Sequence, residues 1–343
     1  ALREAGFLVF GPSQAAARLE SSKAFTKEIC DASGAPTAAW ARFGNAAAAR
    51  NDVTRRGAPI VVKADGLAAG KGVTVAETVD QAHSAIDAIF DGEFGDTSVV
   101  IEEFMEGEEA SFFVLCDGRD GLAMGTAQDH KRVGEGDTGP NTGGMGAYSP
   151  APVVTDAVYQ RIMDEVITPT VEGMAAEGMP YTGFLYAGLM INPEGAPKVI
   201  EYNCRFGDPE TQPIMMRLQS DLAALCLAAL DGKLDQTDIQ WDPRPTLGVV
   251  MAAGGYPDSY DKGDVIDGLD QADSDTVKVF HAGTAEKDGQ VVTSGGRVLC
   301  VTGVGDTVGE AQANAYAGVK QITWRDAYHR TDIGYRAVAR EKS

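Results

Sequence analysis

Short apolar runs alternate with longer amphipathic stretches along this chain, a pattern typical of alternating strands and helices. The apolar runs end at Gly, Pro or charged residues, which are common stop signals. Strands are expected at residues 7–12, 58–65, 72–78, 183–191 and 198–206, with a strand, turn and strand at 98–118. Those at 183–191 and 198–206 are expected to be buried and paired. Helices are expected at 13–34, 79–90 and 221–230, the last buried, and at 155–178, broken near Pro169.

The pattern changes in two places. Residues 130–152 have almost no periodicity and many glycines, which predicts a long ordered or mobile loop, and such loops are usually functional. After the proline-rich joint at 241–245, short strands at 247–253, 276–281 and 290–302 precede a helix at 307–322. This second pattern predicts a separate C-terminal α+β domain.

Composition narrows the class of partner. The 343 residues are 44% apolar and carry a formal net charge of −21, so a sizeable core is expected and phosphate backbones and anionic membranes are repelled. We therefore expect neither nucleic acid nor membrane as a partner. No apolar run approaches the ~20 residues that span a bilayer. Five scattered cysteines without a CxxC pair indicate neither a zinc site nor a disulfide framework, and they fit a reducing cytoplasm.

The stretch GLAAGKGV (66–73) resembles a phosphate-binding P-loop but lacks its spacing and its Ser or Thr. Strands are expected on both sides, so it is interpreted as a glycine-rich hairpin whose backbone N–H groups bind an anion. The alternative is an exposed hairpin with a solvated lysine. The candidate nucleotide-phosphate ligands are Lys63, Gly66, Gly70, Lys71 and Gly72.

A carboxylate-rich turn follows the apolar run VVI within VVIEEFMEGEEAS (99–111). A turn between buried strands can present backbone groups to an adenine edge, while one glutamate accepts hydrogen bonds from ribose hydroxyls. The alternative is a solvated acidic face.

The segment VIEYNCRFGDPETQP (199–213) is the candidate metal site. Glu201 and Asn203 are two apart on an expected strand, so both side chains point to one face and offer oxygen ligands to Mg²⁺. Arg205 can lie on the same face and pair with an anion. For Asp208 and Glu210, a buried polar network is the alternative interpretation.

A third group of charged residues precedes the glycine-rich loop. Asp129, His130, Lys131 and Arg132 stand at an expected strand end and could hold a carboxylate or phosphate. A mobile surface loop is the alternative. No Ser-His-Asp arrangement and no GxGxxG fingerprint accompanies them.

The order of these pieces resembles the ATP-grasp superfamily, in which two α+β subdomains close on ATP. The longer motifs resemble the phosphoribosylamine–glycine ligase (glycinamide ribonucleotide synthetase) family over essentially the whole chain. They are SSKAFTK, KADGLAAGKGV, EEFMEGEEASF, QDHKRVGEGDTGPNTGGMGAYSPAP, YTGFLYAGLM, EYNCRFGDPETQP, GVVMAAGGYP and VFHAGT…TSGGRVLCVT.

The resemblance implies roles for individual residues. Lys23 and Lys63 would contact ATP phosphates under the closing 66–72 loop, Glu103 and Phe104 would line the adenine site, and Glu108 would hold the ribose. Glu201 and Asn203 would bind Mg²⁺ or Mn²⁺. The residues expected near glycine and the acyl phosphate are Asp129, Lys131, Arg132, Arg205 and Asp208, with Arg205 and Lys63 as the catalytic cations.

The resemblance also implies an activity and a domain layout. The expected reaction joins glycine to 5-phosphoribosylamine with ATP through glycyl phosphate, in a monomer or weak homo-oligomer. Residues 1–20 would be the remnant of a Rossmann-like domain, on the order of 80 residues of which are missing. Residues 21–240 would form the ATP-grasp domain, with 36–105 as its flexible small subdomain, and 246–343 the C-terminal α+β domain. The alternatives are another ATP-grasp carboxylate–amine ligase and a nucleotide-binding fragment without turnover.

Overall fold

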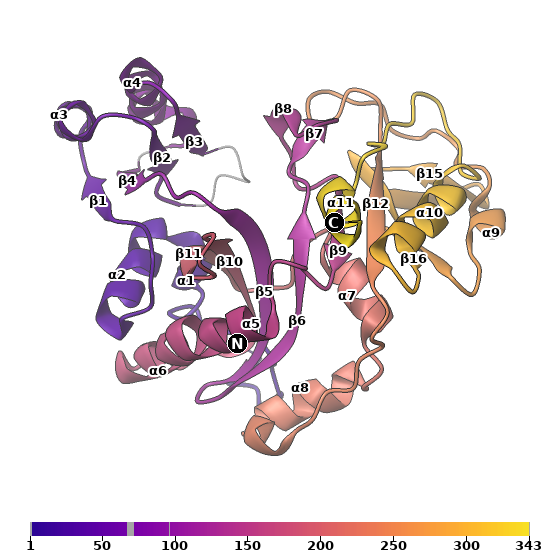
Figure 1. Cartoon of the computed structure of the whole chain (residues 1–343), viewed down its shortest axis with the longest axis horizontal. Coiled ribbons are helices and arrows are strands. Elements are labelled where there is room, and N and C mark those ends of the chain that lie inside the picture. The colour runs from indigo at the N-terminus through magenta and orange to yellow at the C-terminus, as the bar shows by residue number, and fades with distance from the viewer. Residues whose placement is uncertain (1, 67–71, 96, 343) are drawn as a thin grey trace. The chain divides into compact units, whose positions relative to one another are not determined.

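The computed structural model describes residues 2–66, 72–95 and 97–342 (Figure 1). These residues divide into two compact units that are discontinuous along the chain. The first contains residues 1–124, 153–206 and 222–238, and the second contains 125–152, 207–221 and 239–343.

A small four-stranded antiparallel sheet forms one part of the first unit. Its strands run in the order β1 (Trp40–Phe43), β4 (Val99–Glu103), β2 (Ile60–Ala64) and β3 (Val73–Ala76). Helices α3 (Ala46–Arg56) and α4 (Val79–Ala88) bury their apolar faces against it, and a capping box between Thr78 and Gln81 fixes the start of α4. Strands β2 and β3 pair from Ile60↔Ala76 to Lys63↔Val73, which confirms the predicted hairpin.

A second sheet of the first unit contains β11 (Pro197–Asn203), β10 (Thr182–Ile191) and β5 (Glu108–Asp117) in that order. The predicted pairing of residues 183–191 with 198–206 is confirmed by the β10–β11 ladder, which runs from Ile191↔Pro197 to Tyr186↔Asn203. Strands β4 and β5, expected on either side of one turn, belong to different sheets. The remaining elements are α1 (Arg18–Ser21), α2 (Lys23–Ser33), η1 (Ile89–Glu93), α5 (Asp156–Ile162), η2 (Met163–Ile167), α6 (Thr168–Ala176), α8 (Leu222–Leu230) and η3 (Leu234–Gln236).

Two helix predictions for this unit need correction. The expected helix at 13–34 is two helices, because Ser22 adopts an extended conformation and its hydroxyl caps α2 by accepting from the Phe25 N–H. Helix α8 is not buried as its apolar sequence suggested. Only Leu225 and Ala229 are buried on it, and Leu227 is 54% exposed.

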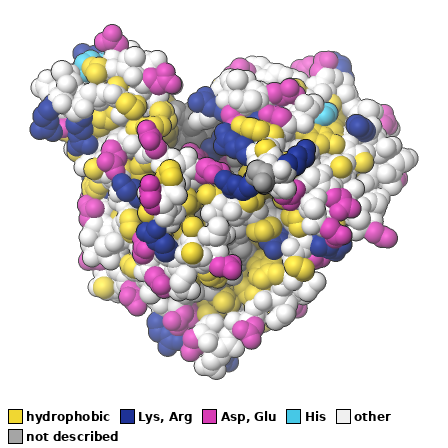
Figure 2. All heavy atoms as spheres, viewed as in Figure 1, with side chains coloured by type: hydrophobic (Ala, Val, Ile, Leu, Met, Phe, Trp, Pro, Cys, Tyr) yellow, Lys and Arg dark blue, Asp and Glu magenta, His cyan; other side chains and the backbone are white. Residues whose placement is uncertain are grey.

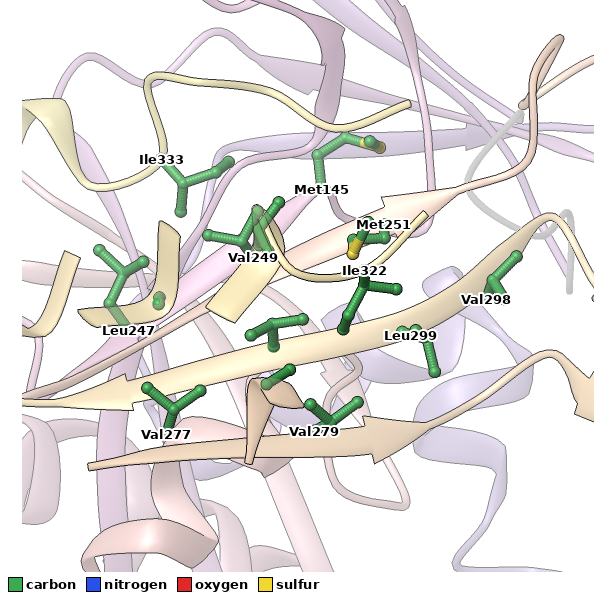
Figure 3. Packing of buried hydrophobic residues seen from close by; sticks show 14 of the residues in the cluster. Met145, Leu247, Val249, Met251, Val277, Val279, Val298, Leu299, Ile322 and Ile333 are labelled. Atoms are coloured by element: carbon green, nitrogen blue, oxygen red, sulfur yellow. The ribbon is translucent and has the colours of Figure 1, made fainter. Parts of the chain in front are cut away.

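The second unit is built on an antiparallel sheet in which the end of β6 (Gly121–Asp129) is followed by β9 (Gly146–Ser149), β12 (Thr246–Ala252), β16 (Arg297–Val304) and β13 (Val277–His281). Helix α10 (Val308–Val319) packs on the sheet, and Leu247, Val249, Met251 and Leu299 lie in the core (Figure 3). The other elements are β7 (Arg132–Gly134), β8 (Thr138–Asn141), α7 (Thr211–Arg217), α9 (Leu269–Ala272), β14 (Thr284–Lys287), β15 (Gln290–Thr293) and α11 (Tyr335–Glu341).

The glycine-rich stretch 130–152 is more regular than its sequence suggested. It forms the β7–β8 hairpin and then β9, which pairs with both β6 and β12. Glycine is required within it, since a Cβ on Gly146 would lie 2.6 Å from the Gly248 carbonyl oxygen. The single strand expected at 290–302 is also two strands, β15 and β16, separated at residues 294–296.

Charged side chains of both signs are interspersed over the face drawn in Figure 2, with Lys and Arg in small groups. Local cation clusters thus exist on a chain with a net charge of −21. Among the described residues, no helix is long and apolar enough to cross a membrane.

Candidate ATP and metal site

Lys63 lies at the end of β2 and is buried, with 5% of its surface exposed. Its Nζ lies 2.9 Å from Glu102 Oε1 and donates to the Ile200 carbonyl oxygen at 3.3 Å. On its other carboxylate oxygen, Glu102 pairs with Lys27 Nζ at 2.9 Å. Two lysines from different elements therefore share one buried carboxylate.

Lys23 is the first residue of α2 and supplies a third lysine to this region. Its Nζ donates to the Gly66 carbonyl oxygen at 2.7 Å. The helix start is fixed because Asp65 accepts from the Ser22 hydroxyl and the Ala24 N–H. Burial lowers the pKa of Lys23, and an anionic ligand nearby would offset this effect by stabilising the charged form.

The candidate metal ligands lie together at the end of β11. Asn203 Nδ2 lies 3.5 Å from Glu201 Oε1, and Arg205 donates to Asn203 Oδ1 at 3.3 Å. Glu20 of α1 accepts from Arg205 Nε at 3.0 Å. Glu201 faces Gly188 across the β10–β11 ladder, where an added Cβ would lie 3.3 Å from Glu201 Cγ. Glycine at this position leaves room beside the carboxylate.

The lysines and the candidate metal ligands lie in the same region of the first unit. Lys63 donates to Ile200, the residue before Glu201, and the charges of both Glu201 and Lys63 act on the pKa of Lys23. A carboxylate and an amide oxygen suit a hard divalent cation that also takes phosphate oxygens and waters. The residues present therefore fit a nucleotide phosphate with its cation. No group of three or more His, Cys, Asp or Glu residues suited to a metal occurs in the part of the chain that the structure describes.

The residues expected around adenine and ribose lie at the end of β4, at the start of β5 and between these two strands. Glu103 ends β4, where its carboxylate pairs with Lys198 Nζ at 2.8 Å, and this contact lowers the pKa of Glu103. Phe104 is 40% exposed, a high value for a phenyl ring. Glu108 begins β5 opposite Ile191.

The glycine-rich loop is described only at its two ends. Gly66 has a φ of +128°, a conformation that side chains disfavour, and Gly72 accepts a hydrogen bond from the Ala64 N–H at 2.8 Å. Gly70 and Lys71 lie outside the described residues.

The remaining predicted residues belong to the second unit, where they form separate contacts. Lys131 Nζ pairs with Asp129 at 2.8 Å, whereas Arg132 donates to the Gly139 carbonyl oxygen at 2.7 Å. Asp208 pairs with Arg297 at 2.9 Å. Arg297, the first residue of β16, also donates to the backbone carbonyl oxygens of residues 143, 144 and 208.

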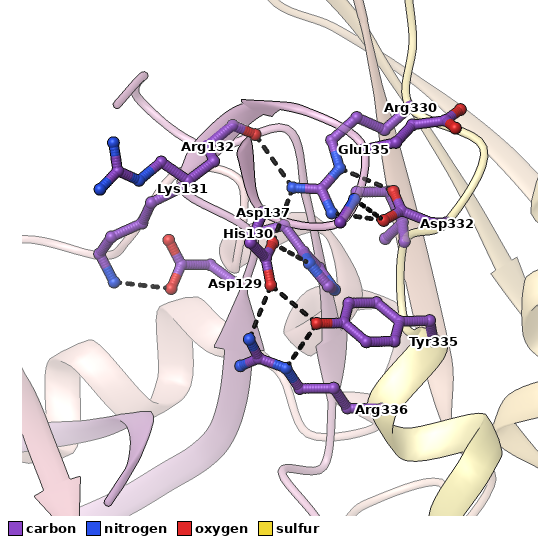
Figure 4. Close-up of polar contacts among 12 residues, drawn as sticks. Asp129, His130, Lys131, Arg132, Glu135, Asp137, Arg330, Asp332, Tyr335 and Arg336 are labelled. Atoms are coloured by element: carbon purple, nitrogen blue, oxygen red, sulfur yellow. Dashed lines mark hydrogen bonds and ion pairs between the residues drawn. The ribbon is translucent and has the colours of Figure 1, made fainter. Parts of the chain in front are cut away.

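A dense polar network ties the β7–β8 hairpin to the C-terminal segment of the same unit (Figure 4). Arg330 is fully buried and donates to Asp332, to Asp137 and to the Arg132 carbonyl oxygen. His130 Nε2 accepts from the Gly334 N–H at 2.9 Å, so its proton is on Nδ1, which faces Asp137 Oδ1 at 3.3 Å. His130 thus orders the loop as a neutral side chain.

This network predicts a dependence of stability on pH. Hydrogen bonds from His130, then Arg330 and Tyr335, hold the pKa of Asp137 well below its usual range. A carboxyl whose pKa is lowered by folding stabilises the protein above its unfolded pKa of about 3.9, and this stability is lost as pH falls below that value. Urea unfolding from pH 6 to 3 should show a smaller loss of unfolding free energy for Asp137→Asn than for the unsubstituted chain. The exposed Asp275→Asn is the control, and parallel curves for all three proteins would contradict the assignment.

Several residues of these sites were not singled out from the sequence. Lys27 follows Lys23 by one helical turn, and this i,i+4 spacing was a usable signal. Glu102 stands beside Glu103, but only the strand pairing shows which of the two is buried. Glu20 is distant in sequence from Arg205, and Arg330 is distant from Asp137, so nothing local marks these two contacts.

Comparison with solved structures identifies the fold class of this chain. The biotin carboxylase domain of 2-oxoglutarate carboxylase from Hydrogenobacter thermophilus, described with MgADP and bicarbonate, is 16% identical with a TM-score of 0.73 over 96% of this chain and 71% of that one. At this identity the likeness shows the fold alone. Residues 21–211 also match the family described as "Phosphoribosylglycinamide synthetase, ATP-grasp (A) domain". The chain therefore has the ATP-grasp fold.

More similar proteins narrow the class to one family. Phosphoribosylamine–glycine ligases from Vibrio parahaemolyticus and Pseudomonas aeruginosa are 64% and 62% identical, over 100% and 99% of this chain and 80% of each relative. The crystal structure of the Thermotoga maritima phosphoribosylamine–glycine ligase is 36% identical with a TM-score of 0.86, covering 95% of this chain and 81% of that one. Residues 246–336 match the "Phosphoribosylglycinamide synthetase, C domain". The chain belongs to the phosphoribosylamine–glycine ligase family.

Proposed function

We propose that this chain is the ATP-dependent ligase that joins glycine to 5-phosphoribosylamine in purine biosynthesis, releasing glycinamide ribonucleotide, ADP and phosphate. The high identity to phosphoribosylamine–glycine ligases over the whole chain supports this reaction over that of another ATP-grasp carboxylate–amine ligase. The structural support is that Lys63 Nζ donates to the carbonyl oxygen of Ile200, the residue before Glu201, so the candidate phosphate and metal ligands can serve one triphosphate.

The first step transfers the γ-phosphoryl group to the glycine carboxylate and gives glycyl phosphate. Lys23 and Lys63 neutralise charge on the phosphate oxygens, and Arg205 stabilises the transferring group through its guanidinium. Their main contribution is position and charge, since phosphoryl transfer asks for little acid–base chemistry from the protein. Glu201 and Asn203 would hold Mg²⁺ or Mn²⁺, which would supply further positive charge at the phosphate oxygens.

The second step is attack of the ribosylamine nitrogen on the acyl carbon, with phosphate as the leaving group. Asp129, Lys131, Arg132 and Asp208 are proposed to contact glycine, the acyl phosphate or the ribosylamine. On the nucleotide side, Glu103 and Phe104 are proposed to line the adenine, Glu108 to hold the ribose, and the backbones of Gly66 and Gly72 to approach the phosphates. We place the reaction in the cytoplasm, where the five cysteines, all described and none in a disulfide, would remain reduced.

An ADP-release assay tests the proposal on the full chain. With Mg·ATP, glycine and freshly prepared 5-phosphoribosylamine, ADP release should require both glycine and the ribosylamine, and omission of either should reduce the rate at least ~100-fold. Calorimetry with Mg·ADP measures nucleotide binding separately. Binding without substrate-dependent ADP release would support a nucleotide-binding fragment and overturn ligation, whereas ADP release with a different amine would indicate another ligase of this fold.

A further inference from the structure

Three buried charged residues form a cluster that includes Lys63, one of the candidate phosphate ligands. It consists of Lys27, Glu102 and Lys63, which are 1%, 1% and 5% exposed. Both ammonium nitrogens lie 2.9 Å from a Glu102 oxygen, but from different ones: Lys27 from Oε2 and Lys63 from Oε1. The cluster carries one net positive charge, which is costly to bury unless an anion completes it.

Each carboxylate oxygen of Glu102 has one of the two lysines beside it. Lys63 Nζ also donates to the Ile200 carbonyl oxygen, beside Glu201, at 3.3 Å. Because an ammonium group has three N–H donors, Lys63 can donate to a further acceptor in addition to Glu102 and Ile200.

We propose that Lys27 is a positioning residue for ATP binding and ligation: it neutralises Glu102 so that the charge of Lys63 is available to the triphosphate. This inference rests on the proposed function, because it needs an ATP phosphate at Lys63. Without Lys27, Glu102 would pair with Lys63 alone, the cluster would become neutral, and the pair would compete directly with the phosphate for the Lys63 ammonium group.

A purely structural role is the competing explanation. Lys27 Nζ also donates to Thr37 Oγ1 at 2.6 Å, and Thr37 donates to the Val199 carbonyl oxygen at 2.7 Å. This chain of hydrogen bonds joins α2 to β11 without using charge. The two explanations differ in what happens when the charge of Glu102 is removed as well.

The test is a charge-rescue series in the full chain, with Mg·ATP affinity measured by calorimetry and kcat and KM for ATP from ADP release. Lys27→Met should weaken Mg·ATP binding at least ~10-fold, the scale of one weakened charge-assisted contact. Adenosine affinity, measured by displacement of the same nucleotide, should change less than ~3-fold. In the double variant Lys27→Met/Glu102→Gln, Lys63 is again an uncompensated cation, so ATP affinity should recover to within ~3-fold of the unsubstituted chain.

Thr37→Val is the matched control, because it removes the hydrogen-bond chain to Val199 and keeps all three charges. It should change ATP affinity less than ~3-fold. Failure of Glu102→Gln to rescue Lys27→Met, or a loss in Thr37→Val equal to that in Lys27→Met, would overturn the proposal in favour of a structural tether. Should Lys27→Met not fold, Lys27→Gln keeps the contact with Thr37 and carries the same rescue test.

The series also separates this inference from the proposed function. Unsubstituted chain that binds no Mg·ATP would contradict the ATP site itself. Unsubstituted chain that binds Mg·ATP, with Lys27→Met binding equally well, would contradict only the role of Lys27.

Discussion

Replacement of Glu201 by alanine is expected to reduce ligation more than ~100-fold, since loss of even an outer partner of a metal ligand typically costs ~10–100-fold. Glu201 is the only carboxylate of the proposed Glu201/Asn203 pair, so its loss leaves a neutral amide to hold a divalent cation. The defect should appear mainly in kcat, because the positive charge supplied at this position acts on the transferring phosphoryl group. ADP release dependent on glycine and 5-phosphoribosylamine is the measurement.

Two comparisons make this prediction specific. A higher Mn²⁺ concentration in the assay should partly restore the ligation rate of Asn203→Ala, because this variant keeps the Glu201 carboxylate. The recovery in Glu201→Ala should be smaller. Glu172→Ala, at an exposed position of α6, should behave as the unsubstituted chain. Turnover within ~3-fold of normal in Glu201→Ala would exclude the carboxylate as a metal ligand.

Substitution of Arg330 by methionine should destabilise the second unit by about 3–5 kcal/mol, the usual cost of removing one partner from a buried charge network. Arg330 is fully buried and contacts two carboxylates, so its loss removes the cation paired with Asp332 and leaves Asp137 paired with Arg336. Methionine keeps most of the side-chain length and packing, which isolates the loss of charge and hydrogen bonds.

Urea unfolding followed by tryptophan fluorescence suits this measurement. Two of the three tryptophans, Trp241 and Trp324, belong to the second unit. The exposed Lys320→Met serves as the control for loss of one positive charge in the same unit. If Arg330→Met lowers the free energy of unfolding by less than ~1 kcal/mol, neighbouring groups or water compensate for the lost contacts of Arg330, which would contradict the prediction.

Much of the fold could be predicted because strong local signals coincide with it. The hairpin of β2 and β3 follows from two apolar runs around a glycine-rich segment, and the pairing of β10 with β11 from two adjacent buried strands. The contact among Glu201, Asn203 and Arg205 follows from their spacing of two along the chain. The alternation of side chains along a strand and the position of a glycine-rich segment are local features, so a single sequence is enough to show them.

The errors arose where distant partners decide the structure. The apolar composition of α8 suggested burial, but burial depends on what packs against a helix, and its sequence cannot show this. Residues 146–149 became strand β9 because β6 and β12 supply hydrogen-bond partners on both sides, despite weak strand propensity. The role of Lys27 depends on Glu102, 75 positions later, and on Thr37.

The insertion of β9 beside β12 bears on how this protein is made. Residues 125–152 leave the ribosome about a hundred residues before β12, so β9 can pair with β6 early but gains its second partner only when β12 has been synthesised. Until then the nascent chain carries an unpaired edge strand, which is a template for association with other chains. A fragment that begins at Thr246 would have the complementary defect, since β12 would lack β9 as its neighbour.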